Sequence, residues 1–147
     1  MRDPFKFLFI NILIPKRTLR RPIKYQIIKL TITGAGLFPI SVETDKAYRK
    51  VTGLQYSSND SAALKDAVFN KFEIDSNEIF PEGFEVKLIQ SGQEVSSNER
   101  FYKIDEKAEG SSVLGSFKDA GNAAAYPYNV YIYLKLETRV DDAKQGT

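Results

Sequence analysis

The sequence predicts a single all-β domain, and two observations carry that prediction. Polar and apolar residues alternate at a period of two in most segments between residues 25 and 137, which is the pattern of half-buried strands. Clusters of Gly, Pro, Asn and Ser separate these segments at intervals of roughly 8–15 residues, as in sandwiches and barrels. A chain of 147 residues fits one hydrophobic core.

Eight segments have strand character. In chain order they are residues 25–33, 37–43, 48–56, 68–75, 84–90, 100–104, 112–118 and 128–137. In the last of these segments, Val130, Ile132 and Leu134 are expected on one face of the strand and Tyr131 and Tyr133 on the other.

Turn-forming and capping residues mark the ends of these segments. Pro39 interrupts residues 37–43, which suits an edge strand or a bulge. Asp60 is a candidate cap for a short helix over residues 61–67. Pro81 and Gly83 predict a tight turn over residues 80–84.

Eight strands suit a jelly roll, a single antiparallel β-sandwich. An immunoglobulin-like sandwich differs by one strand and stays open as an alternative. We expect a basic and apolar N-terminal arm at residues 1–22, the sandwich at residues 23–138 and a polar tail at residues 139–147.

The first segment of the arm, residues 5–15, is strongly apolar. It is shorter than the ~20 residues that a membrane-spanning helix needs. A signal peptide is the next possibility, but no small-residue cleavage pattern follows Ile14. We predict an extended or short helical arm that buries Phe7, Phe9 and Ile12 against a partner or a membrane surface. Packing of the arm onto the chain's own core is the alternative.

Charge is distributed unevenly. Residues 1–30 hold eight basic side chains and one acidic side chain, whereas the rest of the chain is net acidic. The cations of the arm include Lys16, Arg17, Arg20 and Arg21, which could contact phosphates of nucleic acid or of anionic lipids. Solvation of a charged tail is the plain alternative. No DNA-binding module frames these residues.

The composition excludes several kinds of catalysis. The chain has no Cys and no His, which removes thiolate and imidazole metal sites and the nucleophile systems that need a histidine base. Carboxylate pairs remain, and the candidates are Asp105/Glu106, Glu82/Glu85, Glu73/Asp75 and Asp141/Asp142. Such pairs arise by chance among 19 acidic residues. Asp119 and Asn122 offer oxygen ligands for Ca²⁺, but a solvated loop is the simpler interpretation. We expect no catalytic residue, cofactor or metal.

Three segments carry a resemblance to a known class of proteins. Residues 79–84 (IFPEGF), 98–102 (NERFY) and 119–128 (DAGNAAAYPY) resemble stretches in small structural proteins of bacterial viruses that infect Bacteroidetes-type hosts. Over residues 20–138 the chain is similar to a capsid-vertex (penton) or minor capsid protein of tailless, membrane-containing icosahedral bacteriophages.

The resemblance implies a virion protein, made in the host cytoplasm, without catalytic residues or a small-molecule substrate. Its partners would be copies of itself, with a pentamer as one option, and other capsid proteins. The arm would face an internal membrane, nucleic acid or neighbouring subunits. Phe80, Phe84, Tyr126 and Tyr128 would lie at the interface. A non-catalytic binding module, such as an adhesin-like or carbohydrate-binding sandwich, is the alternative.

Overall fold

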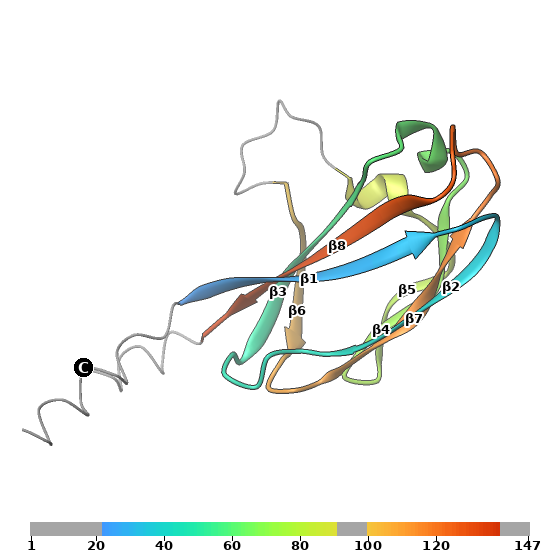
Figure 1. Ribbon diagram of the computed structural model, residues 1–147. Coiled ribbons are helices and arrows are strands. Elements are labelled where there is room, and N and C mark those ends of the chain that lie inside the picture. Colours follow the sequence, from blue (N-terminus) through green and yellow to red (C-terminus); the bar gives the residue numbers. More distant parts are fainter. Residues whose placement is uncertain (1–21, 91–99, 139–147) are drawn as a thin grey trace, which may run out of the picture.

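The computed structural model describes residues 22–90 and 100–138, which form eight strands in two antiparallel sheets of four (Figure 1). The strands are β1 (Ile23–Ile32), β2 (Gly36–Glu43), β3 (Lys50–Ser58), β4 (Val68–Ile74), β5 (Asn77–Glu85), β6 (Tyr102–Lys107), β7 (Ser112–Asp119) and β8 (Tyr128–Glu137). Two single-turn 3₁₀ helices, η1 (Ser61–Leu64) and η2 (Val86–Ile89), complete the set. The prediction of an all-β domain is confirmed.

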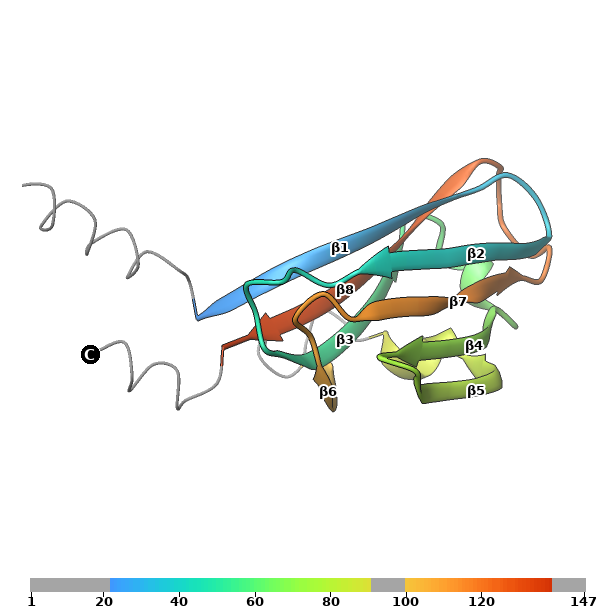
Figure 2. The same ribbon diagram turned by 90° about the horizontal axis from the view of Figure 1, so that it is seen from below.

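The two sheets have the strand orders β1-β8-β3-β6 and β2-β7-β4-β5, and they lie as two layers with the core between them (Figure 2). Strand β1 pairs with β8, β2 with β7, β3 with β6 and β4 with β5, all antiparallel. The chain therefore pairs like one long hairpin whose halves run back along each other. Pairing of β3 with β8 and of β4 with β7 then closes each sheet.

The core comes from the inward-facing residues of both sheets. In β8 every second residue from Tyr128 to Leu136 is buried, as the alternation predicted. The opposite sheet contributes phenylalanines, with ring centroids 5.6 Å apart for Phe69 and Phe80 and 4.1 Å apart for Phe80 and Phe84. Stacked aromatic rings add specific contact energy to the burial of apolar area.

The two ends of the described sandwich meet at one side. The backbone N–H of Thr138 donates to the carbonyl of Pro22 at 3.1 Å. Close by, the side-chain amide of Gln26 donates to the carbonyl of Glu43 at 2.8 Å and accepts from the N–H of Asp45 at 3.1 Å. Gln26 thus ties β1 to the end of β2 in the other sheet. None of the helices formed by residues 22–90 and 100–138 has the length and hydropathy to cross a membrane.

The strand predicted at residues 84–90 is wrong. Strand β5 ends at Glu85 and η2 follows. Val86 and Ile89 are buried, whereas Leu88 is exposed. A spacing of three between buried residues fits a 3₁₀ turn, in which positions i and i+3 share a face. The segment also looked strand-like because Phe84, Val86 and Leu88 alternate with polar neighbours.

The tight turn predicted over residues 80–84 is wrong as well, because these residues lie inside β5. Gly83 does have the positive φ, +84°, that the sequence suggested. Strand β5 is an edge strand, where Pro81 can be accommodated without losing a ladder hydrogen bond. The edge position predicted for Pro39 is confirmed, since β2 is the edge strand at the other side of the same sheet.

Two further boundaries differ from the prediction. The helix expected over residues 61–67 is only η1, although Asp60 caps it as predicted, accepting from the N–H of Ala63 at 3.2 Å. The strand expected at residues 100–104 is β6, Tyr102–Lys107.

Gly115 in β7 provides a test of the packing between β7 and β4. The pairing of these strands shifts register between Phe69 and Phe72, and Lys71 has a φ of 120°. A Cβ at position 115 would lie 2.1 Å from the carbonyl oxygen of Lys71. We expect Gly115→Ala to lower the free energy of unfolding by about 1–3 kcal/mol through overpacking.

The matched control is Gly34→Ala, because a Cβ at Gly34 would meet nothing within 4 Å. Urea unfolding of the two variants should show a large loss for position 115 and a change near zero for position 34. Equal losses would contradict the backbone contact between β4 and β7.

Candidate functional site

The outer face of the β1-β8-β3-β6 sheet carries a patch of apolar and aromatic side chains. We call this patch, formed by Tyr25, Ile27, Phe101, Tyr131 and Tyr133, the aromatic face. Tyr25 is 50% exposed and Ile27 is 57% exposed. These are high values for apolar side chains that lie next to one another.

The strand register brings the members of the aromatic face together. Ile27 pairs with Tyr133 across β1 and β8. The rings of Tyr131 and Tyr133 stack at 6.4 Å, and those of Tyr25 and Phe101 at 5.4 Å. Phe101 lies over Gly53 of β3, where an added Cβ would come within 2.9 Å of the Cβ of Phe101. The same register places Lys135 opposite Tyr25 and Lys29 opposite Tyr131, so lysines border these rings. Exposed apolar side chains grouped in this way are a candidate interaction site.

Tyr25, Ile27 and Phe101 were not among the residues singled out from the sequence. The sequence did carry a signal for β1, because both faces of this strand are apolar. Its odd-numbered positions include Ile23, Tyr25 and Ile27, and its even-numbered positions include Ile28, Leu30 and Ile32. Phe101 gave no such signal, since its position depends on the absence of a side chain at Gly53.

Three of the carboxylates considered for catalysis are paired with cations. Asp105 accepts from Lys50 at 2.6 Å, Glu73 pairs with Lys71 at 2.7 Å and Glu85 with Lys87 at 3.2 Å. Glu106 accepts from the amide of Asn77 at 3.1 Å. Asp141 and Asp142 lie outside the described residues.

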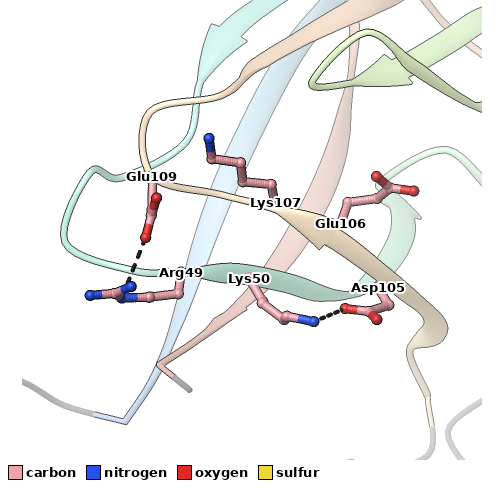
Figure 3. A pocket seen from close by; sticks show the side chains of 6 residues that line it. All are labelled: Arg49, Lys50, Asp105, Glu106, Lys107 and Glu109. Carbon is pink, nitrogen blue, oxygen red and sulfur yellow. Dashed lines mark hydrogen bonds and ion pairs between the residues drawn. The ribbon is translucent and has the colours of Figure 1, made fainter. Parts of the chain in front are cut away.

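A pocket of about 320 Å³ lies where β3 and β6 run side by side, and Figure 3 shows the side chains that line it. They are Arg49, Lys50, Asp105, Glu106, Lys107 and Glu109. The lining contains equal numbers of acidic and basic side chains. Two ion pairs, Lys50–Asp105 at 2.6 Å and Arg49–Glu109 at 3.3 Å, already bind charges that a charged substrate would need. Exposed pairs of this kind contribute little to stability.

A polar cluster lies beside the loop that joins β7 to β8. The buried carboxylate of Asp119 accepts from the hydroxyls of Tyr128 and Tyr126, the latter at 2.6 Å, and from the N–H of Gly121 at 3.0 Å. Asn122 donates instead to the carbonyl of Lys65 at 3.0 Å. The sequence suggested a solvated loop here, and for Asp119 this is wrong.

Asp60 holds the same loop from the other side. Its carboxylate accepts from the N–H groups of Ala124, at 2.9 Å, and of Ala125, at 3.2 Å, in addition to Ala63. Burial by itself would raise the pKa of Asp60, but the backbone N–H groups stabilise the carboxylate and lower that pKa below its ordinary value. These N–H groups donate to both carboxylate oxygens of Asp60, the atoms that a bound cation would contact.

Tyr126 and Tyr128 in this cluster, and the buried Tyr56 near it, have raised pKa values. Burial raises the pKa of Tyr56 to about 12, and burial together with the hydrogen bond to Asp119 raises that of Tyr128. The hydrogen bond to Asp119 is the main cause of the raised pKa of Tyr126. Among the described residues, no three His, Cys, Asp or Glu side chains gather as a metal site would require.

The predicted interface residues fall into two groups. Phe80 and Tyr128 are buried in this chain's own core, which corrects the expectation that they contact a partner. Phe84 packs partly buried against the same core, and Tyr126 is 38% exposed. Only Tyr126 therefore offers substantial surface to a neighbour.

The arm residues lie outside the described part of the chain. They are Phe7, Phe9, Ile12, Lys16, Arg17, Arg20 and Arg21. Comparison of the chain with protein-family models, with curated proteins and with solved structures finds no match.

We predict that the two hydroxyls on Asp119 differ in their effect on stability. Tyr128→Phe should lower the free energy of unfolding by about 1–3 kcal/mol, because water cannot easily replace a donor to a buried carboxylate. Tyr126→Phe should cost less, since Tyr126 is 38% exposed whereas Tyr128 is 3% exposed. Urea unfolding measures both, and a larger loss for Tyr126→Phe would contradict this account of the cluster.

Asp60 should contribute a pH-dependent part of the stability. Its folded-state pKa is lowered, so the contribution is present above the unfolded value of about 3.9 and is lost as the pH falls through the folded pKa. Asp60→Asn should melt at a lower temperature than the original chain near neutral pH, and this difference should shrink in acid.

The control for this experiment is Asp66→Asn, because Asp66 is exposed. Its melting temperature should follow that of the original chain from neutral pH into acid. A difference between Asp60→Asn and the original chain that stays constant with pH would contradict the proposed role of the carboxylate.

Proposed function

We propose that this chain is a structural virion protein, a penton or minor capsid subunit, which assembles into a shell through a jelly-roll body and its N-terminal arm. The observation that carries the proposal is the strand order, β1-β8-β3-β6 facing β2-β7-β4-β5. Jelly rolls have eight strands in two sheets, and viral capsid proteins are among the proteins that use this fold.

The pairing pattern supports a jelly roll over an immunoglobulin-like sandwich. In the immunoglobulin arrangement, with sheets ABED and CFG, three pairs of consecutive strands lie side by side. Here the only consecutive strands that pair within the described residues are β4 and β5. The first and last strands are neighbours instead, as they are when a long hairpin is rolled up.

The aromatic face supports a function in assembly. Tyr and Phe are enriched at protein interfaces, where they bury large areas at low entropic cost. Tyr25 and Ile27, each at least half exposed, would lose that exposure in a complex. The paired charges around the β3–β6 pocket offer less to a substrate than the aromatic face offers to another protein.

The arm adds a second means of attachment. Its apolar segment, residues 5–15, precedes the cations Lys16, Arg17, Arg20 and Arg21, and this combination suits a neighbouring subunit, an internal membrane or nucleic acid. Contacts with phosphates would weaken as salt is raised.

The alternative function is a non-catalytic binding module. The same aromatic face favours it, because exposed rings can also bind a ligand such as a carbohydrate. A binding module would remain monomeric, whereas a shell subunit must associate with itself or with other capsid proteins. Self-association would therefore favour a shell subunit over a binding module.

Removal of the arm tests the proposal. We expect the full chain to form discrete oligomers that grow with concentration in light scattering and sedimentation. A chain that begins at Pro22 should associate less, because it lacks the apolar and cationic segment. Negative-stain electron microscopy of the associated fraction should show rings or shells of uniform size.

The control is the charge-preserving variant Phe7→Ser, Phe9→Ser, Ile12→Ser, which keeps every cation of the arm. Loss of association in this variant would assign the effect to apolar burial, and retention at low salt would assign it to charge. Monomers at all concentrations for both the full and the shortened chain would contradict assembly through the arm.

A further inference from the structure

The open edges of the two sheets differ in how they are protected. An exposed edge strand is a template for pairing with another chain, and proteins blunt such edges with Pro, bulges, charges or short strands. Strand β2 contains Pro39, and β5 contains Pro81 and two shifts in register against β4. Strand β6 has six residues, of which four are charged, and a register shift lies in its pairing with β3.

Strand β1 is the exception. It is ten residues long, contains neither Pro nor Gly and pairs with β8 in one continuous register without a shift. Its charged residues are Lys24 and Lys29, and the ammonium of Lys24 is paired with Asp45 at 2.5 Å. Ile23, Tyr25 and Ile27 are exposed on this strand. Among the described strands, β8 is the only one that pairs with β1.

The hydrogen bond at the N-terminal end of β1 shows which residues of β1 bond to β8 and which face the open edge. The N–H of Thr138 donates to the carbonyl of Pro22, so this pair is a hydrogen-bonded one. Such pairs alternate along an antiparallel ladder, and the even-numbered residues of β1 therefore bond to β8. The N–H and C=O groups of the odd-numbered residues, from Ile23 to Thr31, point to the open edge. Their side chains lie on the outer face, with Tyr25 and Ile27 in the aromatic face.

We propose that the open edge of β1 binds β1 of a second copy of this chain, antiparallel and centred on Ile27, so that two sheets join into one. The inference rests on the proposal that the chain is an assembly subunit, and it names the surface and the partner. Extended strands that add to a sheet edge gain affinity from the backbone and specificity from alternate side chains.

The sequence of β1 is self-complementary in this register. Ile27 lies opposite Ile27 of the second copy, and Tyr25 lies opposite Lys29. The ammonium of Lys29 can then lie against the ring of Tyr25, which is a favourable cation–π arrangement. The exposed Ile23 lies opposite Thr31. Each of these pairs consists of odd-numbered residues, so each can exchange two backbone hydrogen bonds.

Backbone pairing and charge both favour this register. Moving its centre by one residue, to Gln26 or Ile28, would leave one of the five edge-facing residues of β1 without a partner in β1. Centring the pair on Lys29 would place two ammonium groups directly opposite each other, and such like-charge pairs are unfavourable. Centring it on Tyr25 would leave the last residues of β1 without a partner. The register centred on Ile27 pairs all of residues 23–31 and places no like charges opposite each other.

Single cysteines test this arrangement, because the chain has no Cys of its own. In the proposed pair, the Cα atoms at position 27 of the two copies lie about 5.5 Å apart, within the range that a disulfide can bridge. Ile27→Cys should therefore form disulfide-linked dimers under a mild oxidant such as diamide. Ile27 is 57% exposed, so the substitution leaves the core intact.

Two cysteine variants are controls. In Lys29→Cys the two sulfur-bearing residues would be offset by four positions, about 13 Å along the strands. Leu114→Cys lies on β7 of the other sheet and is 43% exposed before substitution. Both should yield at least about tenfold less linked dimer than Ile27→Cys. The double variant Tyr25→Cys, Lys29→Cys should restore cross-linking.

Amide hydrogen exchange on the unsubstituted full chain gives a second readout. Raising the protein concentration should slow the exchange of the amides of Tyr25, Ile27 and Lys29 by about tenfold or more as they become hydrogen-bonded. The amides of Gln26 and Ile28 are internal controls, because they are bonded to β8 at every concentration.

The outcomes separate this inference from the proposed function. Oligomers without protection of the odd-numbered amides, or with equal cross-linking at positions 27, 29 and 114, would overturn the β1 pairing and leave assembly standing. Protection that disappears in the Phe7→Ser, Phe9→Ser, Ile12→Ser variant while this variant still associates would show that the arm occupies the edge, and would also overturn it. A chain that is monomeric at all concentrations would overturn both proposals.

Discussion

The fold depends on backbone hydrogen bonds between strands that are far apart in the sequence. The register of β1 with β8 places Ile23 opposite Glu137, and only β4 and β5 pair with a strand that adjoins them in the chain. Pairing over such distances must overcome a large loss of chain entropy before the core can form. The last strand is the decisive one, because β8 lies between β1 and β3 and contributes a buried side chain at every second residue from Tyr128 to Leu136.

Two buried carboxylates hold the loop that leads into β8 and the first residue of β8. Asp60, which follows β3, binds backbone N–H groups of the loop that precedes β8, and Asp119, at the end of β7, binds the hydroxyl of Tyr128. A carboxylate that is removed from water needs such donors, since an unsatisfied charge in the interior is costly. The polar groups of the cluster are therefore used in positioning the loop. Asp119, which was considered as a calcium ligand from the sequence, therefore serves the fold instead.

Much of the fold could be predicted from the sequence, and the failures have a common cause. The alternation in β8, the edge position of Pro39 and the cap at Asp60 are local properties, and local patterns reveal them. The pairing partners of Phe101 and Tyr25 are not local, since they depend on how β6 and β1 lie across the sheet. The misread segment at residues 84–90 shows the same limit: Val86 and Leu88 alternate like strand residues, but the contacts of Val86 and Ile89 with the core favour a 3₁₀ turn. The resemblance placed Phe80 and Tyr128 at an interface, and the sequence could not show that this chain's own core would bury them.

The two edge strands of the β1-β8-β3-β6 sheet present different surfaces. Near β6, acidic and basic side chains are joined in ion pairs, which leaves less unpaired charge to attract a small charged molecule. Near β1, apolar side chains and an open sheet edge occur on the same strand. Each feature alone is an association liability for a soluble monomer, and nothing in the packing of the core requires Tyr25 or Ile27 to be apolar, because both point away from it. Among the described edge strands, β2 and β5 contain Pro and β6 is short and highly charged, whereas β1 is long, contains two lysines and has neither Pro nor a register shift. This difference is the reason why we propose a second copy of the chain as the partner of β1.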